Sequence, residues 1–148
     1  MKIGIDLGVV KTEAVALHHC GFELIRHRLR TPKDDYNSTL QAMASPVSQI
    51  ERDIGETGMV GIGIPGCISK LTGLAKLFNC TPINGCPIDQ DLAKLLERQV
   101  RVANDANYQS VITRLSRYAF GKEVSTPILK AMHGDSSGVR GAAWLWLK

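Results

Sequence analysis

The chain has 148 residues, of which 44% are hydrophobic and 22% charged, and its formal net charge is +4 at pH 7. A single domain of this length buries enough surface to fold without disulfides or metal, and the apolar fraction excludes a disordered chain. No apolar run approaches the roughly 18 residues of a membrane span, so we expect no membrane partner. Residues 1–6 read as a strand rather than as a signal peptide, and we expect a cytoplasmic protein.

The first part of the chain predicts an antiparallel meander. Three segments alternate as strands do and are joined by short turns: residues 2–8, 12–18 and 22–30. In the third segment, alternation places Arg26, Arg28 and Arg30 on one face. Because no aromatic residue interleaves these arginines, a solvated strand face is favoured over a nucleic-acid patch, and we expect no nucleic-acid partner.

A helix and a buried strand are predicted next. Residues 36–54 have the apolar spacing of a helix, and Pro46 is expected to kink or split it. Residues 59–64 are a short apolar run typical of a buried strand, which Pro65-Gly66 ends. The apolar stripe of the helix consists of Leu40, Met43, Val47 and Ile50.

The following segments predict a hairpin, a helix and a strand. Residues 67–78 read as a hairpin around Thr72-Gly73. Asp89 can cap a helix over residues 90–98, and residues 100–103 form another short strand. The apolar stripe of this helix consists of Leu92, Leu95 and Leu96.

The end of the chain predicts a helix over residues 106–119, a strand over residues 126–132, and a final helix that Asp135 or Ser136 can cap. A meander followed by alternating strands and helices indicates an α/β domain with a mixed sheet. The apolar stripe of the final helix consists of Val139, Ala142, Ala143 and Leu145.

Two glycine-containing turns follow predicted strands. In residues 6–12 (DLGVVKT), backbone N–H groups could meet a phosphate, with Asp6 beside a magnesium ion and Lys11 against the phosphate charge. The alternative is an ordinary hairpin with charged ends. In residues 61–66 (GIGIPG), glycines could let a ligand approach the backbone, or the segment could be only a buried strand and its turn.

The motif Asn104-Asp105-Ala106-Asn107 stands where a predicted strand meets a predicted helix. Ligands of open α/β sheets gather at the carboxyl ends of the strands. A carboxylate at this place can take a proton from a substrate hydroxyl. Asp105 could instead cap the helix, and both roles could hold.

The cysteines suggest neither disulfides nor a zinc cluster. They form no CxxC pair, and no histidine stands at zinc-finger spacing. We therefore expect free, reduced thiols and no bound zinc. The four residues are Cys20, Cys67, Cys80 and Cys86.

Together and in this order, the motifs resemble the ROK family of sugar kinases, most closely its fructokinase (manno/fructokinase) branch. The family's DxGxTK turn, GIPG segment, N-x-x-W-x-NG stretch and NDAN motif match residues 6–11, 63–66, 79–85 and 104–107. The tail, residues 133–144, is similar to the end of the fructokinase branch. The resemblance covers nearly the whole chain.

This resemblance implies the actin-like, ribonuclease-H-like ATPase fold, mainly its N-terminal lobe, and ATP-dependent phosphorylation of a hexose hydroxyl. Asp105 matches the catalytic base that deprotonates the sugar. Gly8 and Lys11 match the turn that meets the ATP phosphates, and Asp6 lies beside the metal, so Mg-ATP is the implied cofactor. The residues that match the sugar site are Pro65, Gly66, Asn79 and Asn104.

The chain departs from the family at both ligand sites. Val9 and Val10 stand where the family has Gly-Thr. Branched side chains disfavour the positive φ that such turns often need, so we expect backbone strain at this turn, and they crowd the approach of a phosphate. Pro82 replaces the tryptophan of the sugar-site stretch. We therefore expect Mg-ATP binding to be weak or absent.

After Asn107 the sequence shows neither the family's second phosphate loop nor its zinc cluster, further sugar ligands or adenosine loop. The resemblance divides the chain into an N-terminal lobe, residues 1–112, and the family's C-terminal strand and helix, residues 113–148, joined directly to it. Most of the C-terminal lobe is absent. Residues 134–138 lack the GK[ST] ending of a phosphate loop and read as the turn before the final helix.

Two functions stay open. The resemblance favours an ATP-dependent sugar kinase, with a hexose and ATP as partners. The valines and the missing loops favour an inactive remnant or a weak sugar-binding domain. The family's DNA-binding repressors carry a helix-turn-helix before the first strand, whereas here that strand begins at Lys2. A homodimer through the exposed cleft around Asp105 is a further expectation.

Overall fold

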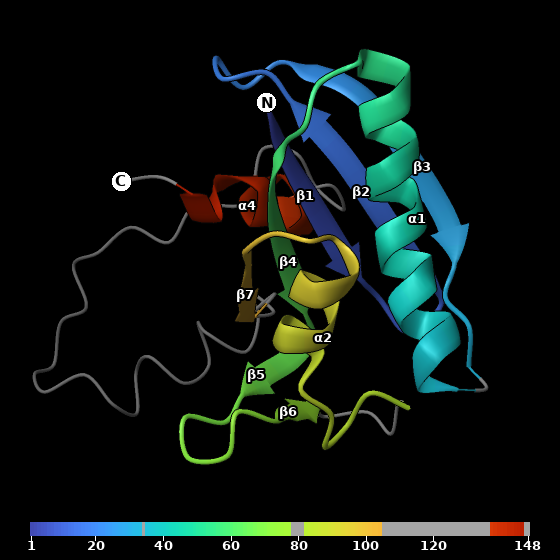
Figure 1. Ribbon diagram of the computed structural model, residues 1–148, viewed down its shortest axis with the longest axis vertical. Helices are drawn as coiled ribbons and strands as arrows, with labels where there is room; N and C mark the ends of the chain where they lie inside the picture. Colours follow the sequence, from blue (N-terminus) through green and yellow to red (C-terminus); the bar gives the residue numbers. More distant parts are fainter. Residues whose placement is uncertain (34, 78–81, 105–136, 147–148) are drawn as a thin grey trace, which may run out of the picture.

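The computed structural model describes residues 1–33, 35–77, 82–104 and 137–146. Its centre is a five-stranded mixed sheet of order β3-β2-β1-β4-β7 (Figure 1). Strands β1–β2 and β2–β3 pair antiparallel, whereas β1–β4 and β4–β7 pair parallel. The predicted meander and mixed α/β sheet are confirmed. The strands are β1 (Lys2–Leu7), β2 (Lys11–Leu17), β3 (Glu23–Arg30), β4 (Met59–Ile64) and β7 (Val100–Asn104).

Helix α1 (Tyr36–Ile54) covers one face of the sheet (Figure 1). The Asp35 side chain caps it by accepting a hydrogen bond from the Ser38 N–H at 2.8 Å. Of the predicted kink or split at Pro46, the split is wrong, because the helix runs through this residue as one element. Apolar side chains on both sides of Pro46 are buried in the same core, and this packing outweighs the lost backbone hydrogen bond.

The predicted hairpin after β4 is confirmed as β5 (Gly66–Ile68) and β6 (Ala75–Leu77), an antiparallel pair. Its loop contains Gly73 at φ +70°, in the left-handed region that glycine adopts without strain. The hairpin forms a separate two-stranded sheet below the carboxyl end of β4 (Figure 1).

Helix α2 (Ile88–Leu95) begins earlier than the sequence predicted. Pro87 is its N-cap residue, so Asp89 lies in the first turn and is not the cap. A carboxylate there still favours the helix through the positive end of its dipole. Leu92 is fully buried, whereas Leu95 is 42% exposed, so the predicted three-leucine stripe is wrong at Leu95.

The tail covers the other face of the sheet with helix α4 (Ser137–Ala143) and the 3-10 helix η2 (Trp144–Trp146). Helix α4 packs on β1, β2 and β4. The predicted helix over residues 106–119, the strand over 126–132, and the caps Asp135 and Ser136 lie outside the described residues. Among the described residues, no helix is both long and apolar enough to cross a membrane. The core on this face contains Val15, Leu17, Val139 and Ala143.

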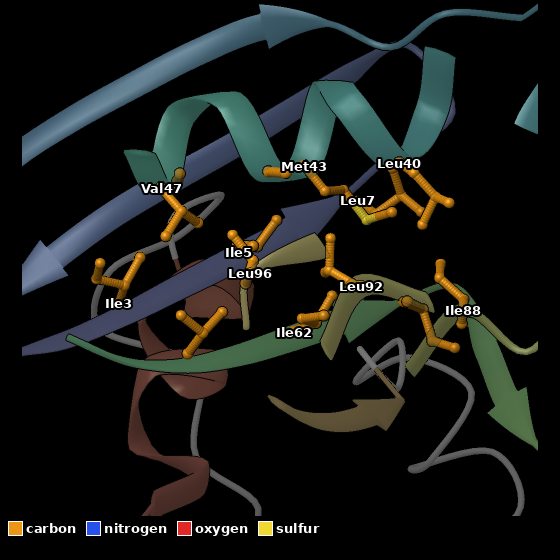
Figure 2. Packing of buried hydrophobic residues seen from close by; sticks show 14 of the residues in the cluster. Ile3, Ile5, Leu7, Leu40, Met43, Val47, Ile62, Ile88, Leu92 and Leu96 are labelled. Atoms are coloured by element: carbon orange, nitrogen blue, oxygen red, sulfur yellow. The ribbon is translucent and has the colours of Figure 1, made fainter. Parts of the chain in front are cut away.

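The larger core lies between the sheet and helices α1 and α2 (Figure 2). Strand alternation explains its composition, because Ile3, Ile5 and Leu7 of β1 point to this face while Gly4 and Asp6 point to the tail. The sheet therefore holds α1 and α2 on one side and the tail on the other. The α1 and α2 residues of this core include Leu40, Met43, Val47, Ile50, Ile88 and Leu92.

Candidate functional site

The carboxyl ends of the three parallel strands lie at one edge of the sheet. Asp6 of β1 pairs with Gly63 of β4, and Ile64 of β4 pairs with Asn104 of β7. The ends of these strands therefore lie side by side. This arrangement brings the first two motifs and Asn104, the first residue of the third motif, to one end of the sheet, as expected for a ligand site of an open α/β sheet.

The turn between β1 and β2 is fixed by β3 as well as by its own hairpin. The Gly8 N–H donates to the Lys11 carbonyl at 2.9 Å, and the Thr31 N–H donates to the Val10 carbonyl at 2.9 Å. The Thr31 hydroxyl donates to the Gly8 carbonyl at 2.7 Å, so in its 2.9 Å contact with the Thr12 hydroxyl it accepts. Both threonines are buried. The turn is thus fixed by one hydrogen bond of its own and by two from Thr31, which follows β3.

The expected strain at Val9 and Val10 is not present. Glu97 is the one non-glycine residue with positive φ in the described part of the chain, so both valines have ordinary backbone conformations. Their side chains are 41% and 65% exposed. The expectation of backbone strain was therefore wrong, whereas the crowding of a phosphate approach by two exposed apolar side chains remains a prediction.

A cavity of about 200 Å³ opens beside this turn. It joins Gly8 and Pro65, two predicted site residues, to Pro82, which stands in the predicted sugar-site stretch. The wall between β3 and α1 was not predicted from the sequence, because Thr31, Pro32 and Lys33 belong to none of the motifs. The lining residues are Leu7, Gly8, Val9, Thr31, Pro32, Lys33, Thr39, Pro65, Pro82 and Ile83.

Asp6 points to the opposite face from this cavity. A Cβ atom built at Gly138 of α4 would lie 2.7 Å from an Asp6 carboxylate oxygen, so the tail helix rests closely against Asp6. In the register of the sheet, Asp6 stands opposite Glu13 of β2, so the two carboxylates lie on the same face. One aspartate fits a magnesium ion that takes its other ligands from phosphate oxygens and water, as Mg²⁺ often does.

The Glu13 carboxylate is occupied by two arginines of β3 and is not available as a metal ligand. It is 2% exposed, and it accepts hydrogen bonds from Arg26 and Arg28 of β3, with the Arg28 Nη2 at 3.1 Å from its Oε2. Burial raises the pKa of Glu13, but the hydrogen bonds and charges of the two arginines outweigh burial and hold this pKa below its ordinary value. The Lys11 ammonium lies 3.8 Å from the same carboxylate. Lys11 therefore faces the tail side with Asp6.

The predicted site residues thus fall into three groups. Gly8 and Pro65 share the cavity, and the backbones of Gly66 and Asn104 lie at the same sheet edge. Asp6 and Lys11 lie on the tail side. Asn79 and Asp105 are outside the described residues, although Asp105 directly follows Asn104 in the chain.

The model of the ROK family matches residues 2–111. An N-acetyl-D-glucosamine kinase of Haemophilus influenzae (strain 86-028NP) is 37% identical over 107 residues, which cover 72% of this chain and 35% of that protein. The homologous kinase of Pasteurella multocida (strain Pm70) is 35% identical over the same length. The chain spans about a third of the length of these curated relatives.

Solved structures have the same arrangement of elements. The ROK hexokinase of Thermus thermophilus aligns with a TM-score of 0.64 at 28% identity, covering 78% of this chain and 39% of that one. An inorganic polyphosphate/ATP-glucomannokinase of Arthrobacter sp. strain KM aligns with a TM-score of 0.62 at 26% identity, covering 84% of this chain and 51% of that one. These likenesses confirm the expected actin-like ATPase fold.

Proposed function

Because this chain belongs to the ROK family, we propose that it takes part in the ATP-dependent phosphorylation of a hexose hydroxyl. The observation that carries the proposal is the meeting of the β1–β2 turn, the Pro65-Gly66 segment and the end of β7 at one sheet edge beside a cavity. A kinase needs such convergence, because phosphoryl transfer depends mostly on positioning and electrostatic stabilisation.

The roles follow from chemistry and position. Asp105, directly after the last residue of β7, would accept the proton of the sugar hydroxyl as that oxygen attacks the γ-phosphoryl group. Asn104 would hydrogen-bond the sugar. The other sugar-site residues of the proposal are Pro65, Gly66 and Asn79.

The phosphate side is made by the β1–β2 turn. Gly8 has no side chain, and a Cβ there would lie 2.8 Å from the Lys11 carbonyl, so this position requires glycine for the turn to close. Lys11 would supply positive charge to the phosphates, and Asp6 would hold the magnesium ion through an oxygen ligand. Bound Mg-ATP supplies the phosphoryl group that is transferred.

The tail completes the lobe in this proposal. Residues 1–112 are the N-terminal lobe, and residues 113–148 are the family's C-terminal strand and helix joined to it. The packing of Val139 and Ala143 against Val15 and Leu17 of β2 supports the second half of this division.

The substrate is a hexose. N-acetyl-D-glucosamine is the first candidate, because curated relatives at 37% and 35% identity are named as its kinases. Fructose is the second candidate, because residues 133–144 are similar to the end of the fructokinase branch.

A sugar-binding domain without phosphoryl transfer is the second candidate function. The observation that favours it is the exposure of the Val9 and Val10 side chains at the turn where a phosphate would approach. Both candidates require sugar binding, and only the kinase requires turnover.

Two measurements on the 148-residue chain test these functions. Calorimetric titration with N-acetyl-D-glucosamine, fructose and glucose detects binding, and an ADP-coupled assay at millimolar Mg-ATP detects turnover with each sugar. The kinase proposal expects turnover that Asp105→Asn abolishes and Asp53→Asn, on the exposed side of α1, leaves unchanged. Binding without turnover selects the second candidate, and neither binding nor turnover overturns both.

A further inference from the structure

The turn between β2 and β3 gathers three metal-ligating side chains at the far end of β2 from the cavity. His18, His19 and Cys20 each offer one ligand atom, and these atoms lie within 4.8 Å of one another. Imidazole nitrogen and thiolate sulfur are the ligands that zinc prefers in proteins. The proposed function uses none of these three residues.

The backbone of this turn is held in place without a metal. The His18 N–H donates to the Phe22 carbonyl, and the Gly21 N–H donates to the His18 carbonyl, each at 2.8 Å. Gly21 has φ +89°, which a glycine adopts at little cost. The Arg140 guanidinium of α4 donates to the Gly21 carbonyl at 2.7 Å. An ion would therefore need to order side chains only.

The three side chains lie close enough for rotation to bring them to the geometry of a tetrahedral site. Zn–N and Zn–S bond lengths of ~2.0–2.3 Å imply ligand atoms roughly 3.3–3.7 Å apart. The three ligand atoms all lie within 4.8 Å of one another. The His18 Nδ1 accepts a hydrogen bond from the Cys20 backbone N–H at 3.4 Å, so the Nε2 of this ring is the atom left for a metal. His19 and Cys20 are exposed, so their side chains can rotate to bring the three ligand atoms to this spacing.

We propose that His18, His19 and Cys20 form a surface site for Zn²⁺, with water in the fourth position. The expectation of no bound zinc rested on CxxC, zinc-finger and family spacings. Such spacings do not describe three consecutive ligands in a tight turn. The site lies next to the tail helix, because Arg140 of α4 donates to the Gly21 carbonyl of the same turn.

Thiol protection tests the site in the unaltered chain. After chelator treatment, the protein is alkylated with iodoacetamide with and without one equivalent of ZnCl₂, and peptide mass spectrometry follows each cysteine. Cys67 on β5 is a free, exposed cysteine like Cys20 and serves as the internal control. Zinc is expected to slow alkylation of Cys20 at least fivefold and that of Cys67 less than twofold.

Calorimetry of ZnCl₂ binding supplies the second measurement. One zinc per chain is expected, with affinity reduced at least tenfold in Cys20→Ser, His18→Gln and His19→Gln and unchanged in Cys67→Ser. Circular dichroism checks that each variant is folded. Equal zinc protection of Cys20 and Cys67, or full zinc affinity in Cys20→Ser, overturns the proposal.

Discussion

Gly4 and Gly61 lie directly opposite each other on the parallel strands β1 and β4, and helix α4 rests on both. A Cβ atom at Gly4 would lie 1.9 Å from the Val139 carbonyl oxygen, and one at Gly61 would lie 1.9 Å from the Ala142 carbonyl oxygen. These distances are far shorter than real Cβ contacts, and the obstructing atoms are backbone. The two glycines therefore allow the tail helix to approach the sheet closely.

Substitution of either glycine should displace the tail. Gly61→Ala is expected to lower the free energy of unfolding by ~1–3 kcal/mol or more, because backbone must move to admit the methyl group. Chemical denaturation measures this loss. Gly141→Ala is the matched control, since a Cβ there meets no atom within 4 Å and alanine favours a helix. Equal stability of the two variants would show that α4 does not pack as described.

Removal of residues 134–148 should destabilise the whole lobe. The truncation exposes Val15 and Leu17 and removes Val139 and Ala143. A loss of roughly 3 kcal/mol or more is expected, because burial of one valine or leucine side chain stabilises a fold by ~1.5–3 kcal/mol. Thermal melting followed by circular dichroism is the measurement. A truncated chain that melts cooperatively at the temperature of the full chain contradicts the role of the tail.

The Val9→Gly, Val10→Thr double variant should not gain stability. Neither valine has a positive φ, so no backbone strain is available for release, and the added glycine increases the entropy of the unfolded chain. We expect the free energy of unfolding to stay level or fall by up to ~1 kcal/mol. An increase of that size in urea denaturation would mean that the turn is strained after all.

Mg-ATP should bind the unaltered chain no more tightly than about millimolar. The exposed side chains of Val9 and Val10 narrow the approach of a phosphate to the β1–β2 turn, and their branched carbons offer no hydrogen bond to it. Isothermal titration calorimetry checks the affinity. The Val9→Gly, Val10→Thr double variant is expected to bind at least threefold more tightly, and micromolar binding by the unaltered chain contradicts the prediction.

Acid should weaken the fold through Glu51. This α1 residue pairs with Arg98 and accepts a hydrogen bond from the Gly58 N–H at 2.8 Å. Burial raises the pKa of Glu51, but these hydrogen bonds and the Arg98 charge outweigh burial, so the folded-state pKa lies below 4.5. The pair therefore stabilises the fold above pH ~4.5, and this contribution disappears as the pH falls through the lowered pKa.

Urea denaturation between pH 7 and pH 3 measures this contribution. Glu51→Gln is expected to be less stable than the unaltered chain at pH 7, with the difference shrinking below pH ~4.5. Glu97→Gln makes the same chemical change at the residue that precedes Arg98 in the chain, and it serves as the control. A stability difference for Glu51→Gln that stays constant over the whole pH range contradicts the assignment.

Periodicity and turn chemistry predicted well the strands that the structure describes, because each of them alternates or is short and apolar between clear breaks. The same reasoning failed at Pro46 and Leu95, where tertiary packing decides. The buried neighbours Met43 and Val47 hold α1 together across the proline, and α2 turns Leu95 to solvent. The site was predicted only in part, because its walls come from segments that are far apart in the sequence. Motifs located Gly8 and Pro65 in the sequence, but only the fold showed that Thr31 and Pro32 complete the cavity wall.

The charged face of β2 makes its alignment with its neighbours unambiguous. Glu13 meets Arg26 and Arg28 only when β2 and β3 pair as observed, and Ala14 and Ala16 then enter the apolar core. A slip of one residue would push a carboxylate among isoleucines and turn the core side chains outward, because strand side chains alternate. Glu13 thus fixes the register of β2 against β3. It raises the free energy of misaligned pairings more than it lowers the free energy of the correct pairing.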